Sequence, residues 1–253
     1  MIKWVDKHIE IEPPEKPRKI TATRLAAVLG QNRYSSPFKV WCEVTRTWEE
    51  PFKETQFTAA GKAIEPKQIE YMKSWVKGLK PMEMEHHKAV LTPTDMFGED
   101  YFKTTRGDFF PDHEIFGGMW DSLLVDDDGC ASGVLEFKTT SKRKDWEGYK
   151  IPEYYAQQAA LYGHLLGVDE IIMVCTFLRW IDYDHPEKFV VTRDNTIFRK
   201  FSLRERYPDF EQLLQRVRIW WNLHVLTGIS PDYDIYGDAE ILRDLKKREE
   251  LAG

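Results

Sequence analysis

The stretch from Gly117 to Thr140, GGMWDSLLVDDDGCASGVLEFKTT, places charged side chains inside an apolar strand. Residues 126–129, DDDG, form a turn signal, so the two halves of the stretch are expected to pair as a hairpin. Side chains alternate across a strand, and Glu136 and Lys138 therefore project from the same face. Asp121, on the first strand of the hairpin, enters near that surface. The chain must fold so that these charges are paired or bound, because a buried lone charge is costly.

Two carboxylates that converge repel one another unless a cation lies between them. Mg²⁺ suits a site made of oxygen ligands, and it keeps waters that can become nucleophiles. Lys138 beside such an ion could position or help deprotonate the water, or stabilise charge that develops on a phosphate. The hairpin thus predicts metal-assisted phosphodiester hydrolysis. The alternative is a solvated hairpin with a surface ion pair, since short motifs also match by accident.

Two helical segments offer further candidates. Glu65, in AAGKAIEP, is either a third acidic group that binds the metal or its water, or an exposed helix glutamate. In YYAQQAALY, Tyr155, Gln158 and Tyr162 form one helical stripe that could hold a metal-bound water or a phosphate oxygen. A competing stripe contains Gln157 instead, and core packing of the tyrosines is the alternative to a functional role.

A run of cations follows the hairpin in KTTSKRKDWEGYK: Lys138, Lys142, Arg143, Lys144 and Lys150. Charge runs are usually solvated. This run adjoins the predicted metal site, where a phosphate backbone would have to lie. The net charge of −6 does not indicate nucleic-acid binding, so any DNA contact must come from such local patches.

The composition is that of an ordinary globular protein, with 42% hydrophobic and 31% charged residues. No apolar run reaches the length of a membrane span, and MIKWVDKHIEIEPP lacks the apolar centre of a signal peptide. Cys42, Cys130 and Cys175 are scattered and form no CxxC pair, which disfavours a zinc or iron–sulfur framework. We therefore expect a cytoplasmic location, where thiols stay reduced.

Periodicity along the chain predicts a single α/β domain with a mixed sheet. Helical patterns cover residues 21–30, a segment after Pro37, 58–76 in one or two pieces because of Pro66, 152–167 and 209–228. Strand patterns cover residues 86–93, 101–110, 116–127, 131–140, 170–178 and 188–193. Residues 1–19 are rich in proline and charge, and we expect an arm without its own core.

Taken together, these motifs resemble the PD-(D/E)xK nuclease superfamily and, more narrowly, the YqaJ-type viral recombinase or lambda-exonuclease-like family. GMWD…LEFK followed by YAQQAALY carries the nuclease pattern, and AAGKAIEP matches the family's Gly-x-x-x-Glu element. ITATRLAAVLGQNRYSSPFKVW is similar to the family's opening segment, and FEQLLQRVRIWWNLHVLTGISP resembles its closing helix. The resemblance covers Ile20 to Pro231.

The resemblance implies a restriction-endonuclease-like core, in which helices flank a central mixed β-sheet. It implies an arm over 1–19 and a single nuclease domain over 20–253. Within that domain we expect a helical part over 20–80, the sheet core with the active site over 88–192, and C-terminal helices over 195–253.

The resemblance also implies a role for each matching residue. The metal ligands and catalytic groups would be Asp121, Glu136, the Phe137 backbone oxygen, Lys138 as the catalytic lysine, Glu65 directly or through water, and Gln158 as the supporting glutamine. The groups that bind DNA or its 5′-phosphate would be Thr23, Arg24, Arg33, Lys142 and Arg143. Thr23 stands where the family usually has serine, which keeps the hydroxyl, and the adjacent Gln157 leaves the glutamine register open.

The implied activity is that of a Mg²⁺-dependent 5′→3′ exonuclease, with Mn²⁺ expected to substitute. It would digest double-stranded DNA ends and leave 3′ single strands for recombination. The resemblance further implies a ring-shaped homo-oligomer, often a trimer, a single-strand annealing partner and a bacterial cytoplasm, whether the gene is phage-borne or bacterial.

Two alternatives stay open on sequence alone. One is a RecB-like or Cas4-like single-strand nuclease, or an endonuclease of the same fold, although Cas4-like enzymes usually carry a cysteine cluster that this chain lacks. The other is a non-catalytic DNA-binding relative. The intact set of Asp121, Glu136 and Lys138 disfavours it, because loss of catalysis would remove the need for these like charges.

Overall fold

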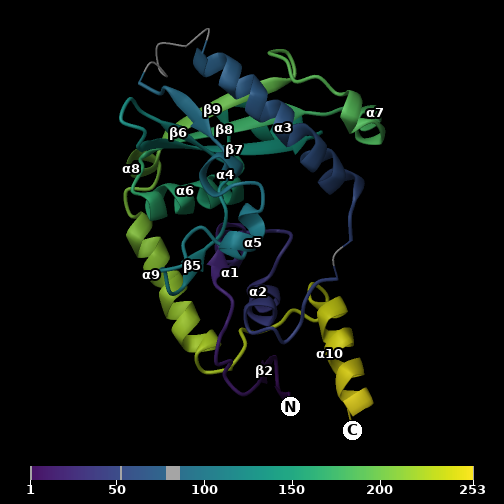
Figure 1. The fold of residues 1–253 in the computed structure, drawn as a ribbon. Coiled ribbons are helices and arrows are strands. Elements are labelled where there is room, and N and C mark those ends of the chain that lie inside the picture. The colour runs from purple at the N-terminus through teal and green to yellow at the C-terminus, as the bar shows by residue number, and fades with distance from the viewer. Residues whose placement is uncertain (1, 52, 78–85, 253) are drawn as a thin grey trace. The chain divides into compact units, whose positions relative to one another are not determined.

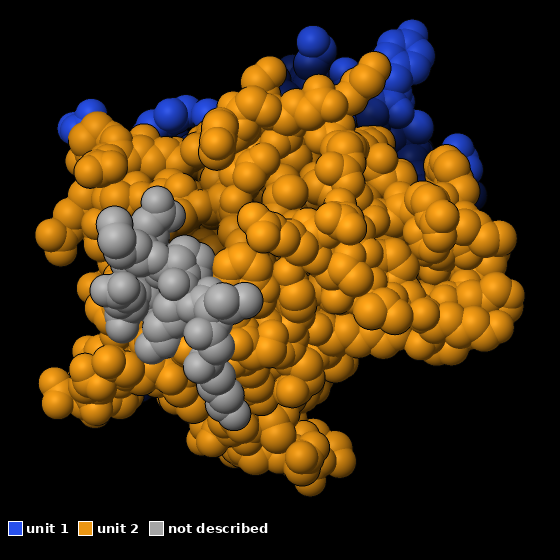
Figure 2. Space-filling model, turned by 90° about the horizontal axis from the view of Figure 1, so that it is seen from above, with its two compact units in different colours: residues 1–52, 111–118, 209–253 blue, residues 53–110, 119–208 orange. Residues whose placement is uncertain are grey.

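The computed structural model describes residues 2–51, 53–77 and 86–252. Residues 1, 52, 78–85 and 253, which fall within the expected arm and domain, lie outside the described residues. The chain forms two compact units, each assembled from separate stretches (Figure 2): unit 1 comprises Met1–Phe52, Pro111–Gly118 and Asp209–Gly253, and unit 2 comprises Lys53–Phe110 and Met119–Pro208. The single nuclease domain over 20–253 stays a prediction.

Unit 2 contains a five-stranded mixed sheet in the order β4-β6-β7-β8-β9, which confirms the predicted fold class. The strands are β4 (Ala89–Leu91), β6 (Ser122–Val125), β7 (Ala131–Thr140), β8 (Glu170–Phe177) and β9 (Thr196–Ser202). β7 pairs with β8 in parallel, and the other neighbours in the sheet are antiparallel. The turn between β6 and β7 forms as predicted, because the Asp126 side chain accepts hydrogen bonds from the amides of Asp128 and Cys130.

Helices α3 (Gln56–Lys77) and α6 (Glu153–Leu166) cover opposite faces of this sheet (Figure 1). Met72 and Val76 of α3 pack in one apolar cluster with Leu135 and Phe137 of β7. Alternation along β7 therefore turns Glu136 toward α6. α3 continues through Pro66 as one helix. α6 ends at Gly167, whose φ of 71° is in the left-handed region that favours glycine.

The strand predicted over 101–110 is wrong, because α5 (Tyr101–Thr105) is a short helix there. It follows α4 (Pro93–Phe97), whose N-cap is Thr92. Phe109 lies 4.8 Å from the Trp120 ring and 4.9 Å from the Phe97 ring, so this aromatic segment packs locally. Aromatic residues favour strands mainly because strands give them packing partners, and here a compact turn supplies those partners.

The strand predicted over 188–193 is also wrong. Asn195 accepts a hydrogen bond from the Thr192 amide and donates one to the Val190 carbonyl, so a side chain occupies backbone groups that a strand would pair. β9 instead pairs with β8 and extends the sheet past residue 192. The remaining short elements of unit 2 are η2 (Arg143–Tyr149), α7 (Trp180–Asp184), η3 (Pro186–Lys188) and α8 (Leu203–Arg206).

Unit 1 is mostly helical. It contains α1 (Ala22–Val28), α2 (Pro37–Val44), α9 (Phe210–Trp220), η4 (Trp221–Val225) and α10 (Ala239–Ala252), with β3 (Ile20–Thr21) parallel to β5 (Phe116–Gly117). The predicted helices from Thr21, after Pro37 and over 209–228 form. The arm contains the hairpin β1 (Lys3–Val5) and β2 (His8–Glu10), and it contributes the fully buried Ile9. Within the described residues, no helix is long and apolar enough to cross a membrane.

Candidate active site

The predicted acidic groups and lysine of the hairpin converge in unit 2. Asp121 directly precedes β6, and its Oδ2 accepts a hydrogen bond from the Phe137 amide at 2.8 Å. Glu136 is fully buried, and its Oε1 accepts a hydrogen bond from Lys138 Nζ at 2.7 Å. The Asp121 and Glu136 carboxyl groups are close enough to interact directly. Two acidic groups and one ammonium therefore meet on one surface of the sheet.

Helix α6 places its glutamine against this cluster. Gln158 Nε2 donates a hydrogen bond to Glu136 Oε1, whereas Gln157 Nε2 donates to Glu153 Oε1 at 3.3 Å. The stripe of Tyr155 and Tyr162 shares the face of Gln158. Lys138 Nζ lies 5.1 Å from the centre of the Tyr155 ring. The structure therefore decides the helix register that the sequence left open, in favour of Gln158.

Glu65 approaches the cluster from α3. It is partly buried, and it interacts electrostatically with both Asp121 and Lys138. Glu65 and Asp121 line one cleft of about 520 Å³, together with Trp120 and Tyr101. The structure thus brings together the five side chains that were expected at the metal site: Glu65, Asp121, Glu136, Lys138 and Gln158.

Burial raises the pKa values of the three acidic groups, and repulsion from Asp121 adds to the shifts of Glu136 and Glu65. Burial, with the repulsion from Asp121, raises the pKa of Glu136 to about 8, although Lys138 opposes the shift. Burial and Asp121 likewise raise the pKa of Glu65 to about 7. The pKa of Asp121 is also raised by burial, against the effects of Lys138 and the Phe137 amide. Burial alone would lower the pKa of Lys138, but Glu136 and Asp121 raise it. Three carboxyl groups therefore share one ammonium.

The donor set fits a hard divalent cation. Glu136 Oε2 is buried and has no hydrogen-bond partner within the part of the chain that the structure describes. Such an oxygen is costly to bury unless a partner reaches it. The other groups around it are carboxylate oxygens, which are the ligands that Mg²⁺ prefers. The Phe137 backbone oxygen stays a predicted ligand.

The residues expected to bind DNA fall into both units. In unit 1, Thr23 Oγ1 lies 3.0 Å from Thr21 Oγ1, and Arg24 Nε donates a hydrogen bond to Glu43 Oε2 at 2.8 Å in a partly buried ion pair. The Arg33 guanidinium lies 4.7 Å from the centre of the Tyr34 ring. Lys142 and Arg143 belong to unit 2, next to the end of β7. The roles of all five stay predictions.

Sequence reasoning missed Gln68. This buried residue of α3 donates hydrogen bonds to the Lys138 carbonyl at 3.1 Å and to Thr176 Oγ1 at 2.8 Å. It thereby joins the helix of Glu65 to the strand of Lys138. The available signal was its position three residues after Glu65, on the same side of the helix.

Comparisons with known proteins identify one family and several relatives. A family model described as a YqaJ-like viral recombinase domain matches residues 3–167. "Uncharacterized protein MG373" of Mycoplasma genitalium is 29% identical, in an alignment that covers 85% of this chain and 83% of that protein. Its homolog in Mycoplasma pneumoniae is 28% identical, with the same coverage. "Uncharacterized protein YqaJ" of Bacillus subtilis is 25% identical over 92% of this chain and 61% of its own length.

Two solved structures of an alkaline exonuclease, LHK-Exo from Laribacter hongkongensis, are also similar. The complex of LHK-Exo with dAMP has a TM-score of 0.49, and the other structure has a TM-score of 0.46. Each is 14% identical to this chain, and each alignment covers 92% of this chain and 94% of LHK-Exo.

Proposed function

Because the chain belongs to the YqaJ-like viral recombinase family, we propose that it is a Mg²⁺-dependent deoxyribonuclease, a 5′→3′ exonuclease that acts on double-stranded DNA ends. The single observation that carries the proposal is the cluster of Asp121, Glu136 and Lys138 at the hairpin, where Glu136 Oε2 is buried without a hydrogen-bond partner among the described residues. A cation beside that oxygen would relieve the surplus of negative charge.

Asp121 and Glu136 would hold the metal, with the Phe137 carbonyl and with Glu65 directly or through water. When bound, Mg²⁺ supplies a nucleophilic water and stabilises charge on the phosphate. Gln158 orients the Glu136 carboxylate by its hydrogen bond to Oε1, which leaves Oε2 for the metal. These contacts support a carboxylate that is positioned before the substrate arrives.

Lys138 would act as a cation beside the reacting phosphate. Its pKa is raised by the two carboxyl groups, so its amine keeps its proton. This favours orientation of the attacking water and stabilisation of developing negative charge over removal of a proton by Lys138. Glu136 Oε1, at 2.7 Å, holds the ammonium in place.

The proposal extends to substrate and assembly. Thr23, Arg24 and Arg33 would bind the 5′-phosphate, and Lys142 and Arg143 would contact the DNA backbone. Arg24 would have to exchange its ion pair with Glu43 for that phosphate. A ring-shaped homo-oligomer, a single-strand annealing partner and substitution of Mg²⁺ by Mn²⁺ belong to the same proposal.

The test is timed digestion of linear 5′-phosphorylated duplexes that are labelled at either end, with Mg²⁺ present and with EDTA instead. We expect metal-dependent release of nucleotides from the 5′ end and no cleavage of a closed circular plasmid. Lys138→Ala should abolish release, and Lys200→Ala, which removes a cation from another part of the same sheet, should not. Equal release by Lys138→Ala, or release that survives EDTA, would contradict the proposal.

A further inference from the structure

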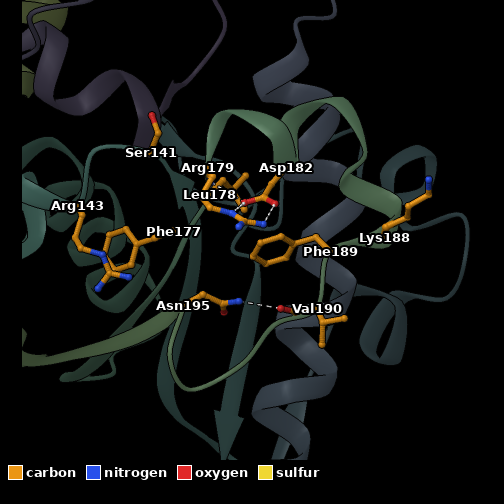
Figure 3. Close-up of a pocket in the computed structure, with 10 residues that line it drawn as sticks. All are labelled: Ser141, Arg143, Phe177, Leu178, Arg179, Asp182, Lys188, Phe189, Val190 and Asn195. Atoms are coloured by element: carbon orange, nitrogen blue, oxygen red, sulfur yellow. Dashed lines mark hydrogen bonds and ion pairs between the residues drawn. The ribbon is translucent and has the colours of Figure 1, made fainter.

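A second pocket of unit 2 lies outside the carboxyl ends of the parallel strands β7 and β8. It has a volume of about 560 Å³, and its lining includes Ser141 and Arg143 after β7, Phe177 and Leu178 at the end of β8, and Phe189 and Asn195 from the loop before β9 (Figure 3). The carboxyl ends of parallel strands are the usual place for a ligand in an α/β sheet. The volume is in the range of small-molecule sites.

Three cationic residues line this pocket, Arg143, Arg179 and Lys188, and the proposed contact with a phosphate is at Arg143. Its guanidinium stacks on the Phe177 ring, 4.2 Å from the ring centre, and donates one long hydrogen bond of 3.4 Å to the Asp194 carbonyl. Among the described residues, no carboxylate lies within ion-pair distance of Arg143. Arg179, in contrast, is neutralised by Asp182 through two hydrogen bonds of 3.0 and 3.2 Å. The pocket therefore offers one uncompensated guanidinium on an aromatic platform.

The opposite wall is apolar and well supported. Phe189 is half-buried, packs against the cluster of Ile64 and Leu178, and points into the pocket (Figure 3). Lys67 Nζ donates hydrogen bonds to the carbonyls of Pro186, Glu187 and Phe189 at 3.1, 2.7 and 2.8 Å. These bonds connect the loop that carries Phe189 to α3 at Lys67, which is two residues after Glu65.

The pocket is also near the metal site along β7. Ser141 follows Lys138 by three residues, which corresponds to about 10 Å of extended strand. A strand whose phosphate reacts at Lys138 would therefore pass the pocket within a nucleotide or two. The groups that meet there are a guanidinium without an acidic partner among the described residues, which suits a phosphate, and an aromatic face, which suits a base.

We propose that this pocket binds one unpaired nucleotide of the DNA strand that is cleaved, with a phosphate on Arg143 and the base against Phe189. The inference rests on the proposed nuclease function and adds to it that the strand is held single-stranded beside the metal site. A volume of about 560 Å³ is sufficient for one nucleotide. Recognition by stacking and charge is tolerant of base sequence, which suits an enzyme that digests a whole strand.

Binding of a 3′-fluorescein single-stranded DNA hexamer in EDTA, followed by fluorescence anisotropy, tests the proposal without turnover. A second hexamer, abasic at every position, carries the same phosphates without bases. Arg143→Gln should weaken binding of both hexamers about tenfold, and Arg143→Lys should weaken it less. Phe189→Leu keeps an apolar side chain and should weaken only the hexamer that contains bases, about fivefold.

Lys188→Gln is the matched control. Lys188 directly precedes Phe189 and also lines the pocket, but its ammonium points away from it (Figure 3). This variant should bind both hexamers within twofold of the wild-type protein. Thermal unfolding of each variant checks that the fold is retained. The proposal is overturned if wild-type protein fails to bind the hexamer, if Arg143→Gln binds it as tightly as Lys188→Gln, or if Phe189→Leu affects both hexamers equally.

Digestion of a duplex with Mg²⁺, run in parallel, separates this proposal from the function on which it rests. If the wild-type protein binds the hexamer through Arg143 but releases no nucleotides, the pocket proposal stands and the nuclease proposal is wrong. If the wild-type protein digests DNA but both pocket variants bind the hexamers as the wild-type protein does, the nuclease proposal stands and the pocket proposal is wrong.

Discussion

Two clusters of charged residues lie on the sheet of unit 2, one around Glu136 and one around Glu170. They differ in how many of the glutamate's carboxylate oxygens have a partner. Glu170 accepts a hydrogen bond from His87 Nε2 at 2.6 Å and forms an ion pair with Lys200 Nζ at 2.6 Å. His86 Nε2 lies 3.4 Å away. Each Glu170 oxygen thus has a partner, whereas Glu136 Oε2 has none among the described residues.

The pKa values of the two glutamates reflect this difference. Burial would raise the pKa of Glu170, but hydrogen bonds from His87 and Lys200 lower it. The pKa of Glu136 is raised to about 8, because burial and Asp121 outweigh Lys138. Glu170 is therefore stabilised as an anion by the protein alone, whereas Glu136 is not.

By number of ligand atoms, the Glu170 cluster would be the better metal site. His86, His87 and Glu170 each offer an atom, and these atoms lie within 4.8 Å of one another. A metal there would have to displace the Lys200 ammonium. The surplus of acidic groups and the buried oxygen without a partner among the described residues instead favour the Glu136 cluster as the proposed cation site.

The largest expected effect that separates the clusters is on catalysis. Glu136→Gln should lower the rate of DNA digestion about 10³-fold, since it removes both a proposed metal ligand and the partner of Lys138. Glu170→Gln should leave the rate within about threefold, because its cluster is independent of the site. The measurement is the initial rate at which labelled nucleotide is released at saturating DNA. An equal loss of this rate in both variants would contradict a catalytic role for the Glu136 cluster alone.

The second-largest expected difference between the two clusters is in how each makes the free energy of unfolding depend on pH. Glu136 binds its proton in the folded protein up to a pH of about 8, whereas its ordinary pKa is 4.5. The folded state then holds more protons than the unfolded state, so stability falls as pH rises through this range. Each pKa unit corresponds to about 1.4 kcal/mol, so a shift from 4.5 to about 8 corresponds to a loss on the order of 5 kcal/mol.

Urea unfolding of metal-free protein between pH 5 and 8 measures this effect. Glu136→Gln should make the decline less steep and leave the part that Glu65 contributes, and Glu170→Gln should not change the decline. For Glu170 the sign is opposite, because a lowered pKa in the folded state stabilises the protein above the ordinary pKa and the benefit is lost as pH falls. A steep decline that persists in Glu136→Gln would show that another group titrates.

Metal binding should stabilise only through the Glu136 cluster. Mg²⁺ at about 100 times its Kd adds about 2.7 kcal/mol to the free energy of unfolding. That corresponds to a rise in Tm of about 5–10 °C for a chain of this size. Differential scanning fluorimetry should show the rise in the wild-type protein and in Glu170→Gln, and its loss in Asp121→Asn. A shift that disappears with Glu170→Gln instead would place the metal at the histidines.

The smallest effect is expected at Lys200. Its side chain is 38% exposed, so its ion pair with Glu170 is largely screened by water. Lys200→Met should lower the free energy of unfolding by less than about 1 kcal/mol. Urea unfolding at pH 7 measures this, and a loss of several kcal/mol would mean that the Glu170 network is as tightly coupled as the Glu136 cluster.

Much of the candidate site could be predicted from sequence because local geometry imposes it. Glu136 and Lys138 share a face through the alternation of β7, and the DDDG turn returns the chain so that Asp121 lies beside them. Gln68 could not be found in this way, since its partners belong to β7 and β8. The prediction of a strand over 101–110 was wrong because it also depended on a partner elsewhere in the chain. The packing of Phe109 against Trp120 outweighed the local propensity of the segment for a strand.

Which chemical groups are available, and which of them share a face, follows from the amino-acid order alone, because the period of a strand or helix is a property of the backbone. The folded chain was needed to show that Gln158 reaches Glu136, that Glu136 Oε2 is buried, and that Arg24 pairs with Glu43. Such pairings depend on the distance and burial of groups far apart in the chain, and these quantities set the strength of charge interactions.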